Sequence, residues 1–368
     1  MPFEEIDILI IGAGPSGSST ALHLLSRDPS MRGRIMVVDK KTFPRQKLCG
    51  GGLTEDAETI LRELGLNIEE IPNVVVGTLY FSTPVNQFEY RSSNSSHTLR
   101  VIDRATFDGW LLSKLLAAGV QVRQGVTVTY FQQTATDCLV STQQGEIKAK
   151  VVVLAEGSNG TLSRLAFPGR KPNKARLVEW YTDENNLTPG QAVFDYSPIN
   201  KNINGYYWDF PSISGLRAKG FFDSTIGNGS IGSLAALAPN GQVVGGHPIL
   251  QFTPRHNNQN GRILAVGDCA GADPLLGEGI SFALGTGANA AQHIIKAMQR
   301  PNWDLAHYQW TIINSPMGRS LYIRWIIAHI LFGLPAPVFQ WLIWDVLNKA
   351  VIWIARHWVL GWARKKTT

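Results

Sequence analysis

Short apolar runs alternate with glycine-rich turns at the start of the chain. Residues 6–11 form an apolar run that ends in glycines, and from 18 to 25 small and apolar residues recur at helical spacing. A second strand-like run, 34–38, ends at Asp39. A strand, a tight turn, a helix and a second strand in this order predict a βαβ-type unit.

The turn in this unit reads Gly-x-Gly-x-x-Gly, with its glycines at Gly12, Gly14 and Gly17. In a dinucleotide-binding turn, such glycines provide the tight bend, the close approach of backbone to a pyrophosphate and the close packing of helix on strand. The helix N-terminus then faces the phosphates. Asp39 ends the second strand, where a ribose-binding acid belongs. The alternative is an incidental glycine turn, but the flanking strands, helix and acid favour a dinucleotide site.

The pattern changes along the rest of the chain. Helices are predicted at 55–64 and 105–118, and strand-like runs at 120–123, 126–131, 138–141 and 149–154. Between 171 and 252, aromatic and polar residues alternate between turn signals, which favours an antiparallel sheet. At 262 the pattern returns to strand, turn and long helix. We therefore expect a discontinuous nucleotide-binding domain (1–75, 98–170 and 260–300), an inserted substrate domain (76–97 and 171–259) and a helical C-terminal region (301–368).

Composition excludes several classes of protein. Of the 368 residues, 44% are hydrophobic and 17% are charged, against about 25% charged in an average soluble domain, which excludes a disordered chain. Thirty-six glycines without a short repeat exclude collagen and solenoids. The three cysteines are too few for a disulfide framework and indicate a reducing compartment. The acidic N-terminus lacks the basic start of a signal peptide, so we expect the mature chain to begin at Met1.

Basic residues gather at the C-terminal end, where 320–368 contains six Lys or Arg, one acid and six of the eleven tryptophans. A nucleic-acid site would spread basic residues over a folded face, so we expect no nucleic acid and a membrane surface as the partner. The uncharged run 325–344 is broken by Gly333, Pro335 and Pro337, which argues against a spanning helix. A helix over 338–366 would carry a narrow polar stripe. Two alternatives remain open: a helical hairpin packed on the body, and a docking face for a membrane-protein complex.

Four further motifs follow the glycine turn in order. They are Cys-Gly-Gly-Gly from Cys49; Arg104 with Phe-Asp three residues on; Tyr206, Trp208 and Phe210 alternating before a proline; and Gly-Asp at Asp268, followed by Pro-Leu-Leu-Gly-Glu-Gly with Gly277 and Gly279. From about residue 5 to 295 the chain resembles the geranylgeranyl reductase family of FAD-dependent enzymes. The cysteine-glycine and Tyr-x-Trp-x-Phe-Pro motifs are fairly specific to that family, whereas the others occur across flavin monooxygenases, halogenases and reductases.

The resemblance implies an α/β fold: a glutathione-reductase-like, FAD-binding Rossmann domain with an inserted antiparallel substrate sheet and a C-terminal helical tail. It implies FAD held by Gly12, Gly14, Gly17, Asp39, Lys40, Arg104, Asp268, Gly277 and Gly279. Cys49 would be catalytic, since the cysteine loop of the family lies beside the flavin, and the wall of Tyr206, Trp208 and Phe210 would hold a long hydrocarbon. The cations Arg45 and Lys47, close to Cys49 in the sequence, would favour the thiolate form of Cys49. Backbone N–H groups at a helix N-terminus suit the negative charge that develops on a reduced flavin.

The implied reaction is reduction of C=C bonds in an isoprenoid chain carried by a lipid, a chlorophyll or a quinone, with NADPH or ferredoxin as the electron donor. Glu156 and Gly157 stand where related flavoproteins carry Asp-Gly, which keeps the ferredoxin-type donor open. Histidine and cysteine show no metal-ligand spacing, so we expect no metal.

The alternatives are a flavin monooxygenase or halogenase on the same fold, and a non-catalytic flavoprotein subunit or assembly factor of a membrane complex. We expect peripheral attachment on the cytoplasmic side of a membrane. A chain that ends at Met317 should remain a folded flavoprotein.

Overall fold

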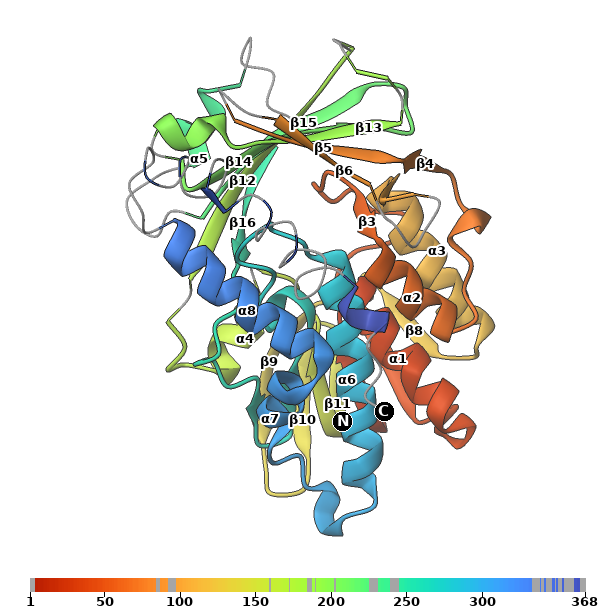
Figure 1. Cartoon of the computed structure of the whole chain (residues 1–368). Coiled ribbons are helices and arrows are strands. Elements are labelled where there is room, and N and C mark those ends of the chain that lie inside the picture. Colours follow the sequence, from red (N-terminus) through yellow and green to blue (C-terminus); the bar gives the residue numbers. More distant parts are fainter. Residues whose placement is uncertain are drawn as a thin grey trace.

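The computed structural model describes residues 4–83, 87–91, 97–158, 160–171, 173–183, 187–188, 190–201, 203–224, 231–238, 245–332, 338, 341, 346–347, 349, 353 and 361–364. Within these residues two large sheets lie one above the other, with helices beside the lower one (Figure 1). The helices are α1 Pro15–Arg27, α2 Glu55–Glu63, α3 Arg104–Ala117, α4 Thr161–Ala166, α5 Ile231–Ala235, α6 Ile280–Met298, α7 Tyr308–Asn314 and α8 Pro316–Leu331.

The lower sheet has eight strands among the described residues. They are β1 Glu4–Ile11, β2 Ile35–Asp39, β8 Gln121–Gln124, β9 Val128–Gln133, β10 Cys138–Thr142, β11 Gly145–Leu154, β17 Gln259–Asn260 and β18 Ile263–Ala265. Strands β18, β11, β1, β2 and β8 run parallel in that order, and helix α1 connects β1 to β2. The predicted nucleotide-binding α/β unit is therefore confirmed. Strand β11 pairs with β10 along its first half and with β18 along its last three residues.

Alternate residues of β1 point to opposite faces of this sheet and belong to two different cores. Ile8 and Ile10 pack with residues of α1, α3 and α6, whereas Leu9 and Ile11 pack with residues of β9, β10 and α4. Both faces are covered, which explains the nearly continuous apolar run of this strand in the sequence.

The upper sheet has seven strands among the described residues: β5 Thr78–Ser82, β6 Gln87–Tyr90, β12 Lys174–Thr182, β13 Gln191–Asp195, β14 Gly205–Pro211, β15 Arg217–Asp223 and β16 Gly245–Leu250. Their order is β16-β12-β15-β14-β13-β5-β6. Neighbours are antiparallel, as predicted, except that β13 runs parallel to β5. The parallel pair joins the segment before residue 97 to the segment after 171. The sheet thus unites the two stretches that we assign to the substrate domain.

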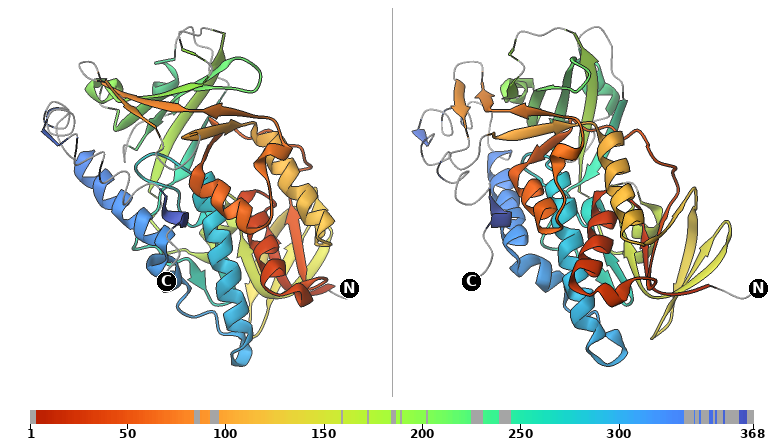
Figure 2. Two further views of the ribbon diagram at one scale, coloured as in Figure 1. Left: turned by 45° about the vertical axis from the view of Figure 1, so that its right-hand side comes forward. Right: turned by 90° about the vertical axis from the view of Figure 1, so that its right-hand side faces the viewer.

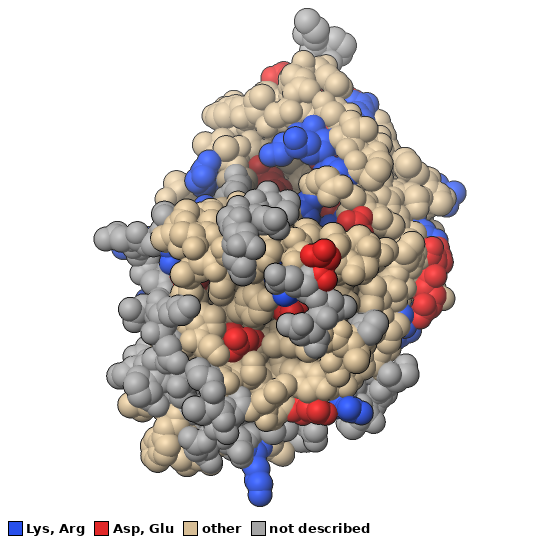
Figure 3. All heavy atoms as spheres, turned by 90° about the horizontal axis from the view of Figure 1, so that it is seen from above, with Lys and Arg blue, Asp and Glu red and all other residues tan. Residues whose placement is uncertain are grey.

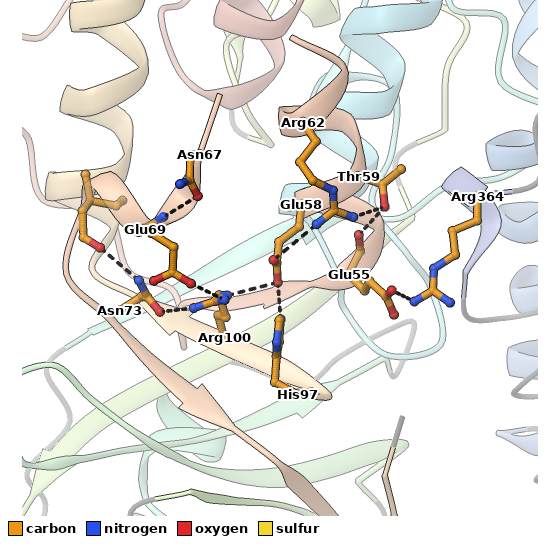
Figure 4. Close-up of polar contacts among 11 residues, drawn as sticks. Glu55, Glu58, Thr59, Arg62, Asn67, Glu69, Asn73, His97, Arg100 and Arg364 are labelled. Carbon is orange, nitrogen blue, oxygen red and sulfur yellow. Dashed lines mark hydrogen bonds and ion pairs between the residues drawn. The ribbon is translucent and has the colours of Figure 1, made fainter. Parts of the chain in front are cut away.

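A small sheet, with β3 Gly52–Thr54, β7 Leu99–Ile102 and β4 Asn73–Val76 in that order, lies between the two large ones. Its contact with α2 is polar and buried (Figure 4). The Glu58 carboxylate of α2 forms a hydrogen bond with His97 Nε2 at 2.6 Å and an ion pair with Arg100 at 3.3 Å. Arg100 of β7 also donates to Asn73 of β4 at 2.7 Å, so charge-assisted contacts connect α2 through the central strand of the small sheet to β4.

The C-terminal region packs against α6. Figure 2 shows α8 running along the outer side of α6. Gly285 in α6 leaves room that Met317 and Trp362 fill, and the Trp362 ring stacks on Phe282 with centroids 5.3 Å apart. Helix α8 begins at Pro316, capped by Ser315, and ends before Gly333. Helix α8 and Trp362 thus pack on the body, whereas the second arm of the hairpin alternative and most of the predicted striped helix over 338–366 lie outside the described residues.

Among the described residues, no helix combines the length and the apolar character that crossing a membrane requires. On the face of the molecule seen from above, the charged side chains that are drawn in colour form small groups, several of them with opposite charges side by side, on a mainly uncharged surface (Figure 3).

Candidate functional site

The three glycines of the N-terminal turn have different surroundings. A side chain at Gly12, where φ is +113°, would meet the Ala155 carbonyl at 2.3 Å. A side chain at Gly17 would meet the Gly12 carbonyl at 1.9 Å, so Gly17 serves the packing of α1 on β1. Gly14 borders a cavity of about 1070 Å³, and a Cβ there would approach only the end of the Arg45 side chain. The backbone around Gly14 is therefore open to a ligand.

The acid at the end of β2 lies against this turn. Asp39 accepts hydrogen bonds from the backbone N–H of Ala13 at 2.9 Å and of Lys41 at 2.8 Å. The next residue, Lys40, is exposed and borders the same cavity. The carboxylate is thus held at the mouth of the glycine turn, in the position of a ribose acceptor.

The opposite wall of the cavity is the loop before α6. Gly277, with φ of +65°, and Gly279 border the cavity just ahead of the helix N-terminus. Asp268 faces Lys47, whose Nζ lies 3.4 Å from the carboxylate. Burial opposes ionisation of Asp268, but Lys47 and then Arg104 hold its pKa below the ordinary value. The loop, the N-terminus of α6 and the Asp268 carboxylate therefore border one space.

Cys49 lies on a third side of the cavity, partly buried, with its Sγ accepting a hydrogen bond from Gly51 N–H at 3.4 Å. Arg104, at the first position of α3, is buried and forms a bidentate pair with Asp108, both contacts 3.0 Å. Burial works against the charged form, yet Asp108 and then Cys49 raise the pKa of Arg104 above its ordinary value. The guanidinium thus stays charged beside the thiol.

This arrangement differs from the sequence-based expectation in which cations accompany Cys49. Arg45 pairs with Asp108 at 3.2 Å and Lys47 pairs with Asp268. Both cations are engaged by acids that lie far away in the sequence, and Arg104 faces the thiol instead.

The aromatic residues of β14 form the apolar part of the cavity wall. Tyr206, Trp208 and Phe210 are all buried and border the cavity on one face of the strand. The Tyr206 hydroxyl donates to the Leu276 carbonyl, which connects this wall to the loop before α6. The Trp208 ring lies over Gly220, and its Nε1 lies where a side chain on Gly50 would be. The wall thus reaches the cysteine loop.

The structure therefore brings every predicted site residue except Gly17 to one cavity. Sequence reasoning missed two groups of residues. Asp108 belongs to the motif that contains Arg104, but its pairing with Arg104 was not predicted, although the i,i+4 spacing of opposite charges on a helix indicates it. The side chains of α8 that line the cavity, Ile327, Ile330 and Leu331, have no such signal.

Comparison with known proteins agrees with this geometry. The model of a family described as pyridine nucleotide-disulphide oxidoreductase matches residues 6–192, just over half of the chain. The chain belongs to this family. Its FAD-binding domain, together with relatives named as reductases, identifies the protein as an FAD-dependent oxidoreductase. The cradle at Gly14, which only a ligand or a longer side chain would fill, fits that cofactor.

One relative of this oxidoreductase is digeranylgeranylglycerophospholipid reductase 3 of Methanosphaera stadtmanae, 25% identical over 90% of this chain and 88% of the relative. Two solved structures share the fold. A geranylgeranyl bacteriochlorophyll reductase-like protein of Thermoplasma acidophilum has a TM-score of 0.79 at 18% identity over 99% of both chains. A flavin-dependent brominase has a TM-score of 0.69 at 18% identity over 96% of both. The resemblance to geranylgeranyl reductases and the predicted fold class are confirmed.

Proposed function

We propose that this oxidoreductase reduces C=C bonds of an isoprenoid chain carried by a lipid, a chlorophyll or a quinone. The observation that carries the proposal is the cavity of about 1070 Å³, which is bordered by both the dinucleotide cradle and the aromatic wall of β14. Its size is at the upper end of the range for ligand sites. Such a space suits a dinucleotide together with a long apolar substrate.

The walls would hold the hydrocarbon and exclude water. Trp208 and Phe210 line one side, and Ile327 and Leu331 of α8 line another. Apolar surface buried on binding contributes about 25 cal/mol per Å², so a prenyl chain gains affinity along its whole length. A dry cavity also strengthens every electrostatic contact with the reacting atoms.

Cys49 would provide the proton. Held by the glycine turn, Asp39 and the loop before α6, FAD in its reduced form would supply hydride chemistry, and the Cys49 Sγ–H would give a proton to the alkene carbon that does not receive the hydride. The thiolate left behind is stabilised by the charged Arg104 and regains a proton from water. Two electrons and one proton thus reach the alkene with the hydride, and the second proton comes from the thiol.

NADPH or a ferredoxin-type protein would return electrons to FAD. Glu156 bonds the N-terminus of α4, accepting from Ser163 N–H at 2.9 Å, and burial raises its pKa. Because the Glu156 oxygens already accept hydrogen bonds from α4, they are poorly placed to bind a nicotinamide nucleotide. Ferredoxin therefore remains a candidate donor. We also propose that the C-terminal region docks the enzyme on the membrane that holds its substrate.

The proposal is tested by anaerobic incubation of the reduced holoenzyme with a geranylgeranyl lipid, followed by mass spectrometry. We expect the mass to rise by two hydrogen atoms for each double bond. Cys49→Ala should keep bound FAD and lose most of the turnover, whereas Cys138→Ala, in the core away from the cavity, should keep it. Equal turnover in parent and Cys49→Ala would remove the thiol from the mechanism.

The brominase neighbour supports a second candidate, a flavin-dependent oxygenation or halogenation on the same fold. Oxygen separates the two. A reductase works without oxygen and loses electrons to it, whereas a monooxygenase or halogenase makes product only when oxygen is supplied. Unchanged prenyl mass in the anaerobic assay, with a new product in air, would favour the second candidate.

A further inference from the structure

One arginine of helix α8 contacts the loop that precedes α6. Arg324 of α8 is fully buried and forms ion pairs with Asp273, also fully buried, and with Glu278 at 3.2 Å. Its guanidinium lies 5.0 Å from the centre of the Phe282 ring. The two acids stand at opposite ends of the loop, so a side chain from α8 joins both ends.

Both acids hold the backbone and neighbours of this loop. Asp273 accepts hydrogen bonds from the N–H groups of Leu275 at 2.8 Å and Leu276 at 3.1 Å. Glu278 accepts from Thr54 Oγ1 and Ser281 Oγ, each at 2.6 Å. Three residues between the two acids border the cavity: Leu275, Leu276 and Gly277. The orientation of the loop therefore depends on one fully buried carboxylate, Asp273, and on one whose side chain is about 10% exposed, Glu278.

Negative charge is crowded here. Asp56, a third buried acid, bonds the N–H groups of Gly361 and Ala363. Burial and the charge of Glu278 raise the pKa of Asp56 to about 6. Removal of one partner of a buried ion pair leaves an uncompensated charge, which is strongly unfavourable. Arg324 lies among these acids and offsets their charge.

We propose that Arg324 is a positioning residue of the FAD site. It holds the loop 273–279 in place and lowers the combined charge of Asp273 and Glu278 from −2 to −1, so that the N-terminus of α6 faces the flavin with less negative charge beside it. Helix α8 thereby completes the flavin site from outside the nucleotide-binding domain. The proposal depends on FAD binding and not on the prenyl substrate.

Three full-length variants test it: Arg324→Gln, Arg324→Lys and, as a matched control, Arg319→Gln on the exposed side of the same helix. For each we would measure the thermal unfolding of the apoprotein, the Kd for FAD and the midpoint potential of the bound flavin. Arg324→Gln should weaken FAD binding at least tenfold. It should weaken the binding of reduced FAD more than that of oxidised FAD, because Asp273 and Glu278 without their arginine repel the negative charge of the reduced ring.

A tenfold greater loss for reduced than for oxidised FAD lowers a two-electron potential by about 30 mV. Arg324→Lys should restore the potential in part, because an ammonium group keeps the charge but lacks the planar fork that serves two carboxylates. Arg319→Gln should match the parent in all three measurements.

A lower melting temperature of Arg324→Gln with the parent's Kd and potential would overturn the proposal and leave Arg324 a purely structural residue. If Arg324→Gln fails to fold, Arg324→Lys decides: parent-like Kd and potential overturn the proposal, and an intermediate shift in both supports it. No prenyl substrate is present in these measurements. A failure of the proposed reduction would therefore appear in the mass assay alone.

Discussion

Gly14 and Gly17 belong to one motif but meet different constraints. Gly17 touches backbone, so any side chain there disrupts the packing of α1 on β1. Gly14 has φ of −70°, which any residue adopts, and a Cβ there would lie 3.3 Å from the flexible end of Arg45. The fold therefore tolerates a side chain at Gly14, whereas a dinucleotide bound across the turn does not.

We therefore expect Gly14→Val to fold like the parent and to lose FAD. The β-branched side chain occupies the space that the pyrophosphate needs to approach the backbone. Flavin absorbance after gel filtration gives the occupancy, and circular dichroism gives the fold. Gly169→Val, at an exposed position with no neighbour within 4 Å of an added Cβ, is the control and should retain FAD. Full occupancy in Gly14→Val contradicts the assignment of this turn.

Strand β12 contains a buried acid that the proposed reaction does not use. Glu179 lies between Gly220 of β15 and Gly245 of β16 in the sheet register. The Trp208 ring occupies the space over Gly220, and Leu48 occupies the space over Gly245. Two glycines thus admit large apolar groups on both sides of a carboxyl, and burial raises the pKa of Glu179 to about 7.

A raised pKa makes the native state bind this proton more tightly than the unfolded state, whose pKa is near 4.5. Glu179 therefore favours folding below pH 4.5, and that contribution is lost as the pH rises to about 7, by up to about 1.4 kcal/mol per pH unit. Glu179→Gln should remove this decline. Urea unfolding of both proteins at pH 5 and pH 8 measures it, with the exposed Glu146→Gln as control. If the unfolding free energies of the parent and Glu179→Gln differ by the same amount at pH 5 and at pH 8, the Glu179 carboxyl is not protonated in the folded state.

The whole molecule decides what the C-terminal region does. Leu321 and Arg324 face inward, whereas Tyr322 and Ile326, about 41% and 37% exposed, face outward from the same helix. Helix α8 also lines the cavity. If its apolar outer face lay on a lipid surface, the opening of the cavity would lie next to that surface. The expectation that a chain ending at Met317 folds independently conflicts with these buried contacts, since such a chain lacks Arg324 and Trp362.

Membrane docking is better tested by surface variants than by truncation. Tyr322→Asp with Ile326→Asp should keep FAD and lose sedimentation with vesicles of mixed anionic and neutral phospholipids, because two charges replace apolar surface at the interface. Tyr130→Asp with Leu116→Asp, both about 53% exposed on other elements, is the matched control and should sediment like the parent. Equal sedimentation of the two double variants would refute docking through α8.

Local patterns in the sequence were sufficient to predict the nucleotide-binding unit, because its strands, glycine turn and ribose acid are close in the chain and each has its own signature. The long helix after Asp268 and the antiparallel sheet followed from hydrophobic periodicity in the same way. The resemblance to a known family then supplied FAD and the expected site residues, which the fold brings to one cavity.

Pairings between distant charges were decided by the tertiary structure alone. Arg45 and Lys47 precede Cys49 by four and two residues in the sequence, whereas Arg104 is far from it. Yet acids engage Arg45 and Lys47 elsewhere, and Arg104 is the cation that faces the thiol. Arg324 immediately precedes the long uncharged run 325–344, which suggested lipid, but a buried arginine is stable only beside acids such as Asp273, 51 residues earlier. The sequence shows where each cationic residue stands in the chain. Whether that residue stabilises a thiolate, a loop or a lipid contact depends on the acids that the folded chain brings next to it.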